Sequence, residues 1–549
     1  MEWHWKAALN YYSPSVLELS WLLEYGEERR RDKSKALELL RLAAKLNNET
    51  AQYLLGLKHA TGDGVPRDLA TANEYYGRAA ASGEARAQNN LGAQLVDGLG
   101  TTKDVIKGIE WIRKSALQGN SVAMVTLGFF HETGFGLPKN LELAVEWYRR
   151  AADSGDARGQ KYLGFMLASG LGASKDVARA IEWYQKAVDN GYSDAAPALA
   201  NLYIRMGGDA SAAQAARWLR RGVTLGNAEA MNNLAAFIDV GSIVALGEES
   251  AVSLYERATE MRNASAMTSM GIRYIHGRDV IRDVPRGVLL LEDAAATGNT
   301  FAKTMLAAVL ATAPEGVMGN VRRAIVLAIE ASQFDDFAAV LAGQIAVGAP
   351  SQITQAEIDI LRPRLQRVAR SSTASNATMA KLVLGAVSRL PQWNTLDIDL
   401  IRADLHELSE LGNDDASFGL IALYLEKSAH LVKSTRGIEL LQKLSSGSSK
   451  YAAPARILER LLSEGGKNYA TVEEFLQSLV PEIVSGNTFA AILVAIAAVS
   501  KEPEAAAAVF RALIAKGDPI ARAQLCKLIQ DYKVLPSGSA EMRLCLSVP

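Results

Sequence analysis

The chain is 549 residues long, its formal net charge is −1, and 22% of its residues are charged. This even balance leaves no basic field of the kind that binds nucleic acid or an anionic membrane, so neither partner is expected. Two cysteines, Cys526 and Cys545, are too few for a disulfide framework, although a single bridge between them stays open.

Residues 1–48 are predicted to be N-terminal capping helices, over 15–23 and 34–46, without a glycine-rich turn. The end unit of a repeat array faces water on one side and is therefore often atypical. No apolar signal core begins the chain, so we expect a cytoplasmic protein with reduced, buried thiols. We interpret the aromatic residues of this segment as a cover for the first repeat rather than a binding site; they are Trp3, Trp5, Tyr11, Tyr12 and Trp21.

Residues 49–298 are predicted to hold seven repeats of 35–36 residues. A Leu-Gly pair recurs at 55–56, 91–92, 127–128 and 163–164, and it continues in degraded form downstream. Apolar residues every three to four positions predict two amphipathic helices per unit. A hairpin of that size cannot bury its apolar faces alone, so the period predicts a stacked array of helix pairs.

The two helices of a unit are separated by glycine-rich turns, such as 62–64 and 134–136, which suit left-handed backbone. Asp68, Asp104 and Asp176 follow three of these turns and are expected to cap the second helix. The second helices also share a tryptophan column, which we interpret as core between repeats rather than a stacking site for a ligand; it comprises Trp111, Trp147, Trp183 and Trp218.

The rest of the chain keeps helical patterning but loses the glycine turn. We predict divergent helical repeats over 299–412, with a possible linker near 371–376, and divergent C-terminal helical repeats with a tail over 413–549. The most apolar run, 489–499, has about 11 residues. A membrane span needs roughly 20, so this run is predicted to be a packed helix.

No pattern that carries chemistry stands out. The six histidines lack metal-binding spacing, and a ligand site shared by the equivalent His59 and His131 is disfavoured. No strand precedes the glycine turns, no Gly-x-Ser-x-Gly elbow occurs, and Asp335-Asp336 is interpreted as solvated surface. We therefore predict no catalytic residue, metal or cofactor, and we disfavour a cryptic enzyme in 299–549.

The unit resembles the Sel-one-like repeat, a branch of the tetratricopeptide-repeat superfamily. The resemblance rests on A-x-x-x-L-G at 51–56 and 87–92, on G-x-G-(V/L) at 62–65, and on A-x-x-W-Y-x-x-A-A-x-x-G at 144–155. It is specific over 49–191, weaker to 298, and limited to the period beyond. It implies an all-α fold, a right-handed superhelical solenoid of helix-turn-helix repeats, with first helices lining the concave face.

The resemblance also implies scaffold or adaptor work without catalysis, through a protein or peptide bound in the concave groove. The alternative is a regulatory or substrate-recruiting subunit of a caspase-like protease or a signalling enzyme carried on another chain. By analogy with related superhelices, groove residues are expected on first helices, around the Leu-Gly pair. They are Tyr53, Arg86, Asn89, Phe129, Glu132, Arg158, Lys161, Phe165, Asn201, Arg205, Glu229, Asn232 and His276. Aromatic anchors mixed with amides and guanidinium groups suit an extended peptide, whereas the competing interpretation is an ordinary solvated face.

Overall fold

The chain forms two compact units, Met1–Asn263 and Ala264–Pro549, so the division falls within the predicted array of seven repeats. Each unit is described by itself. The computed structural model describes residues 13–25, 31–242, 249–314, 317–371, 374–388, 396–426 and 435–447, and the single residues 393, 455 and 459.

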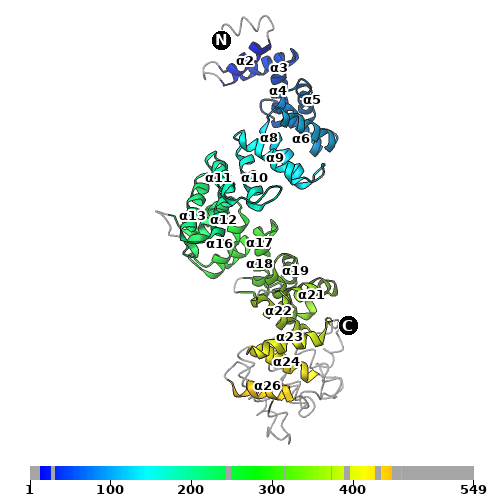
Figure 1. Cartoon of the computed structure of the whole chain (residues 1–549), viewed down its shortest axis with the longest axis vertical. Coiled ribbons are helices and arrows are strands. Elements are labelled where there is room, and N and C mark those ends of the chain that lie inside the picture. The colour runs from blue at the N-terminus through cyan, green and yellow to red at the C-terminus, as the bar shows by residue number, and fades with distance from the viewer. Residues whose placement is uncertain are drawn as a thin grey trace. The chain divides into compact units, whose positions relative to one another are not determined.

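Every regular element in these ranges is a helix, which confirms the all-α prediction (Figure 1). The helices of the first unit are α2 (Ser13–Tyr25), α3 (Lys33–Lys45), α4 (Glu49–Thr61), α5 (Leu69–Ala81), α6 (Ala85–Asp97), α7 (Val105–Leu117), α8 (Ser121–Thr133), α9 (Leu141–Asp153), α10 (Ala157–Ser169), α11 (Val177–Asp189), α12 (Ala195–Met206), α13 (Asp209–Thr224), α14 (Ala228–Asp239) and α15 (Ala251–Glu260). Those of the second unit are α16 (Ala264–His276), α17 (Val284–Ala296), α18 (Thr300–Thr312), α19 (Val321–Ala331), α20 (Asp336–Gly348), the short 3-10 helix η2 (Pro350–Gln352), α21 (Gln355–Ala369), α22 (Ala374–Val387), α23 (Ile398–Glu410), α24 (Asp414–Glu426) and α26 (Thr435–Ser446).

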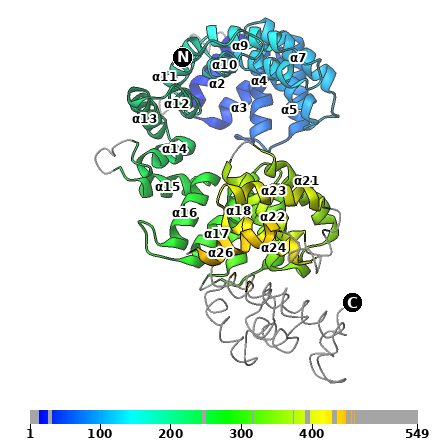
Figure 2. The same cartoon turned by 60° about the horizontal axis from the view of Figure 1, so that its bottom comes forward.

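In the first unit each even-numbered helix packs against the odd-numbered helix that follows it, and the pairs stack in chain order. We call these the first and second helices of a repeat. The first helices α8, α10, α12 and α14 also contact one another in sequence, whereas no comparable contact joins α7, α9 and α11. The first helices therefore lie on the inner side of the curve, as Figure 2 shows for α10 and α12.

The turns between paired helices have the backbone that their glycines predicted. Gly62, Gly98, Gly134 and Gly170 end the first helices in the left-handed region, with φ between 72° and 82°. The aspartate caps are confirmed as well, since Asp68 accepts hydrogen bonds from the backbone N–H of Ala70 and Thr71, and Asp104 and Asp176 act alike. Asn140 has the same role at the start of α9, where the predicted pattern lacks an aspartate.

The tryptophan column is less deeply buried than the sequence predicted. Trp147 and Trp183 are half-buried, and each lies under the cation three residues on, Arg150 and Lys186. The neighbouring tyrosines, led by the fully buried Tyr148, hold the core position instead. Trp218 is buried as predicted, whereas the other tryptophans only pack against the core, because a helix places adjacent side chains about 100° apart and only one of two neighbours can take the central position.

A glutamine column that the sequence analysis did not single out joins successive repeats. The buried Gln160 donates from Nε2 to the carbonyl of Ala152 at 3.4 Å, and its Oε1 accepts from Asn190 Nδ2 at 3.0 Å. Gln52 and Gln88 bond the preceding second helix in the same way. The repeated Ala-Gln pair at the start of first helices was the available signal.

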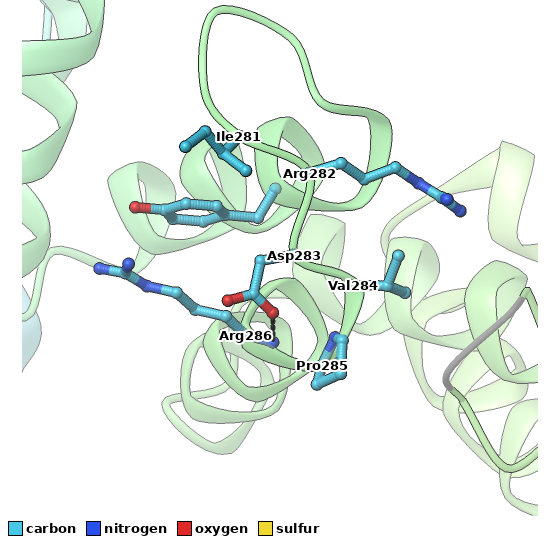
Figure 3. A pocket seen from close by; sticks show the side chains of 7 residues that line it. Ile281, Arg282, Asp283, Val284, Pro285 and Arg286 are labelled. Atoms are coloured by element: carbon cyan, nitrogen blue, oxygen red, sulfur yellow. Dashed lines mark hydrogen bonds between the residues drawn. The ribbon is translucent and has the colours of Figure 1, made fainter.

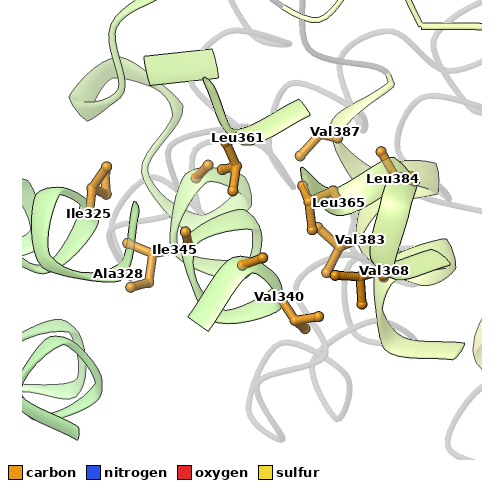
Figure 4. Close-up of a cluster of buried hydrophobic side chains, with 14 of the residues drawn as sticks. Ile325, Ala328, Val340, Ile345, Leu361, Leu365, Val368, Val383, Leu384 and Val387 are labelled. Atoms are coloured by element: carbon orange, nitrogen blue, oxygen red, sulfur yellow. The ribbon is translucent and has the colours of Figure 1, made fainter. Parts of the chain in front are cut away.

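The second unit has a continuous apolar core that extends from α16 to α26. Figure 4 shows one part of it, where Val340 of α20, Leu365 of α21 and Val383 of α22 lie together. Helix α22 begins at Ala374, so the C-terminal half of the segment expected to be a linker is helical. A positive-φ glycine, Gly277, follows α16, and α22 contains a Leu-Gly pair at 384–385 that packs against Leu405 of α23.

Several predictions fall on residues that the structure does not describe, namely the aromatic cap residues Trp3, Trp5, Tyr11 and Tyr12, both cysteines, and the apolar run 489–499. Trp21 of that predicted cap is 53% exposed, at a ring-centroid distance of 6.0 Å from Tyr25. In the described part of the chain, none of the helices is both long and apolar enough to cross a membrane.

Candidate partner-binding face

Twelve of the thirteen predicted groove residues lie on first helices of the first unit, from α4 to α14. His276 ends α16 and belongs to the second unit. The twelve fall into three groups: an exposed apolar row, polar side chains held by local contacts, and residues around a pocket.

The exposed row consists of the residues directly after the small residue of each Leu-Gly position. Phe129 on α8 is 46% exposed and Phe165 on α10 is 38% exposed, and these two helices contact each other. Leu57 and Ala93 extend the row toward the N-terminus and Asn201 extends it toward the C-terminus. We call these five residues the inner row. Leu57 and Ala93 were missed by the sequence analysis, although they occupy the same repeat position as Phe129.

Arg86 is held in place near Tyr53. Its guanidinium lies 4.5 Å from the centroid of the Tyr53 ring, and its Nε donates to Glu84 Oε1 at 2.6 Å. Burial raises the pKa of the Tyr53 hydroxyl. Arg86 thus already has an anionic partner at the start of its own helix and an aromatic face on α4 of the preceding repeat, which reduces its capacity for a partner's carboxylate.

Glu132 and Lys161 flank a pair of stacked rings between α8 and α10. Tyr148 donates from its hydroxyl to Glu132 Oε2 at 2.7 Å, and its ring stacks on Tyr162 at 5.1 Å. Lys161 Nζ lies 4.5 Å from the centroid of the Tyr162 ring. Burial, followed by this bond to Glu132, raises the pKa of Tyr148, so its hydroxyl stays a proton donor. Glu132 therefore stabilises the packing of α9 on α8 within one repeat.

The predicted amides and Arg158 are likewise engaged. Asn89 donates to Asn90 and Asn232 donates to Asn233, at 3.2 and 3.1 Å. Arg158 lies 3.5 Å from Asp156, which caps α10. Arg205 is exposed on α12. Most polar members of the predicted row thus make contacts inside the fold, and the inner row supplies its free apolar surface.

Asn201 and Glu229 meet at a pocket of about 320 Å³ between α12 and α14. Leu219 of α13 also lines this pocket and is fully buried. The sequence analysis missed the other side chains that matter here, which are Ile204, Asn233 and Phe237. Ile204 and Phe237 lie three and five residues from inner-face positions, a spacing that could have placed them on this face.

A second pocket, of about 460 Å³, lies in the second unit at the connection between α16 and α17 (Figure 3). Asp283 accepts from the backbone N–H of Arg286 at 3.0 Å, and the Arg286 guanidinium lies 4.3 Å from the Tyr274 ring centroid. The polar groups here serve the helix cap. Among the described residues, no group of three or more His, Cys, Asp and Glu side chains could hold a metal ion.

Comparison with known families finds the same period. The family model described as Sel1 repeat matches residues 13–48, 50–84, 85–120, 121–156, 157–192, 228–263 and 264–299. The first match covers helices predicted to be only a cap. The unmatched stretch 193–227 holds α12 and α13, where Gly208 precedes α13 without a side-chain cap.

Solved structures of similar proteins have low sequence identity to the chain. A protective antigen of uropathogenic Escherichia coli displaying an SLR fold is 22% identical, with 86% of this chain and 97% of that chain covered and a TM-score of 0.47. A Sel1 repeat protein from Oxalobacter formigenes is 29% identical, with 45% and 96% covered and a TM-score of 0.40. An immunity protein from Pseudomonas aeruginosa is 19% identical, with 40% and 82% covered and a TM-score of 0.27. No curated protein matches the chain.

Proposed function

We propose that the chain, which carries seven Sel1 repeats between residues 13 and 299, is a non-catalytic scaffold. In this proposal it binds a peptide segment of a partner protein along the inner row. Sel1 repeats generally mediate interactions between proteins. The choice of face, the extended peptide and the absence of catalysis are our proposal. A cytoplasmic location remains a prediction from the sequence.

The observation that carries the proposal is the exposure of Phe129 and Phe165 at equivalent positions of two contacting helices. Large apolar side chains exposed in register lose contact with water when a partner covers them, which stabilises the complex. The polar groups beside them already bond within the fold, as Glu132 does with Tyr148, so a partner gains little from breaking them.

The spacing of the row predicts the pattern of the peptide. Helices in contact lie about 8–10 Å apart, and an extended or polyproline chain rises about 3.1–3.3 Å per residue. Roughly three residues of such a peptide therefore span one repeat. A peptide that contacts both Phe129 and Phe165 should carry apolar side chains three residues apart.

The test is selection of peptides from a random library displayed on phage against the full chain. Selection is repeated against the double variant Phe129→Ser with Phe165→Ser. We expect enrichment of apolar residues at positions i and i+3 with the natural chain and loss of that pattern with the variant. Equal enrichment on both proteins would contradict the inner row as the binding face.

A further inference from the structure

The pocket between α12 and α14 has an apolar wall and an acidic group that pairs with no other described residue. Its apolar side chains come from three helices: Ile204 of α12, Leu219 of α13 and Phe237 of α14. Glu229 is its one charged lining residue, and neither an ion pair nor a hydrogen bond joins the Glu229 carboxylate to another described residue.

The charge of Glu229 is opposite to that of its equivalents in α6 and α10. Five residues before the leucine of the Leu-Gly position, α6 has Arg86 and α10 has Arg158, and each is paired with an acidic residue, Glu84 or Asp156. At the same repeat position α14 has Glu229 without such a partner. The site thus offers negative charge for which the described residues supply no paired cation.

The other polar groups of the pocket are amides. Asn201 makes no hydrogen bond with another described side chain, and Asn233 accepts one hydrogen bond from Asn232. Amide oxygens and a carboxylate together accept hydrogen bonds from an ammonium group, which has three donors and no acceptor. The apolar wall suits the four-carbon stem below such a group.

We propose that this pocket binds a lysine side chain of the partner peptide, with its alkyl stem against Ile204 and Phe237 and its ammonium group at Glu229 and Asn201. This proposal rests on the proposed function, because the lysine belongs to the peptide that binds along the inner row. The pocket lies beyond α10 along the row, so the lysine should stand roughly four to six residues from the apolar pair, at about 3 Å of rise per residue.

The pocket can be tested without the peptide, because n-butylammonium chloride reproduces the side chain. Its binding to the full chain is followed by saturation-transfer-difference NMR, beside n-butanol and n-butylguanidinium. We expect saturable binding of n-butylammonium and roughly tenfold weaker binding to Glu229→Gln, because hydrogen bonds to charged groups are the stronger ones. Asn201→Asp adds a second carboxylate and should tighten binding.

The matched control is Glu182→Gln, which removes an equally exposed carboxylate from the second helix α11 and should leave binding unchanged. Equal binding of n-butanol, or equal affinity of Glu229→Gln and Glu182→Gln, would overturn the proposal. Tighter binding of n-butylguanidinium would overturn the choice of lysine. Phe129 and Phe165 take no part in this measurement, so its failure is distinguishable from failure of the inner row.

Discussion

The ring of Tyr148 lies directly against the backbone of Gly128, so closely that a Cβ at position 128 would stand 2.7 Å from Tyr148 Cε1. Tyr76 meets Gly56 in the same way at 2.6 Å, and Tyr184 meets Gly164 at 3.1 Å. In each of these repeats, the glycine of the Leu-Gly pair on the first helix therefore contacts the buried tyrosine on the second helix. This contact fixes how closely the two helices of a repeat approach.

Gly128→Ala should destabilise the third glycine-turn repeat by about 1–3 kcal/mol, the usual cost of extra volume in a packed core. Gly164→Ala should cost less, because the equivalent distance there is longer. Each repeat contacts only its neighbours, so the loss of stability should be local. Hydrogen exchange of α8 and α9 measures it.

Gly77→Ala is the matched control, since Gly77 lies within α5 and a Cβ there would meet no atom within 4 Å. It should stabilise the chain by about 0.4–1 kcal/mol through the unfolded state and helix propensity. Equal destabilisation by all three substitutions would show that the tyrosine contact is not the cause.

Tyr148→Ala should cost about 3–5 kcal/mol, because it empties a fully buried aromatic site and removes the hydroxyl that bonds Glu132. Trp147→Ala should cost clearly less, since Trp147 is half-buried and its ring lies 4.7 Å from the Arg150 guanidinium. Thermal unfolding of the two variants side by side provides the comparison. A larger loss from Trp147→Ala would restore the tryptophan column to the core.

Gln160→Ala should weaken the joint between adjacent repeats by about 1–3 kcal/mol, because the Ala152 carbonyl and the Asn190 amide both lose a partner. Gln185→Ala removes a single, partly buried hydrogen bond to the Tyr203 hydroxyl and should cost less. Hydrogen exchange in α10 and α11 reports the difference. The account of the glutamine column fails if both variants exchange alike.

Acid should loosen the start of α21. The hydrogen bond from Arg322, together with those from Thr354, lowers the pKa of Glu357 to about 2. A carboxyl whose pKa is depressed on folding stabilises the fold above its ordinary pKa, near 4.5, and loses that contribution as the pH falls toward 2. Protection of α21 from hydrogen exchange should therefore fall across this window in the natural chain.

Glu357→Gln should lower that protection at neutral pH by the equivalent of about 1 kcal/mol, a typical value for a lost helix cap, and flatten its pH dependence. Glu330→Gln, which removes a surface carboxylate paired with Lys303 instead, should leave the α21 profile unchanged. An unaltered slope in Glu357→Gln would remove Glu357 from the explanation.

The period, the helix pairs, the glycine turns and the aspartate caps could all be predicted from the sequence. Each depends on local backbone chemistry, such as the positive φ of Gly134 or the capping oxygen of Asp104. The sequence did not tell Trp147 from Tyr148, because the helical period places either on a partly apolar face. Which of two adjacent rings is buried depends on the first helix that faces them, where Gly128 leaves room for the ring of Tyr148.

The positions of the candidate site residues could be predicted from the sequence. Whether their side chains are free to contact a partner could not. Counting from the Leu-Gly pair placed Phe129 and Phe165 correctly on exposed inner faces. The same counting could not show that Arg86 is held by Glu84, because partners of side chains depend on rotamers and neighbouring loops. Nor could it show that Asn201 and Glu229 share one pocket, which requires the packing of α12 against α14.

The central claim is that a partner peptide covers the inner row. Calorimetric titration of a selected peptide into the full chain tests it most directly, with Phe129→Ser/Phe165→Ser as the variant. The control is Ile106→Ser/Leu143→Ser, which removes two exposed apolar side chains from the second helices α7 and α9. We predict about tenfold or greater loss of affinity in the inner-row variant, as expected for two aromatic anchors, and unchanged affinity in the control. Unchanged affinity in the inner-row variant, or equal loss in both, would contradict the account.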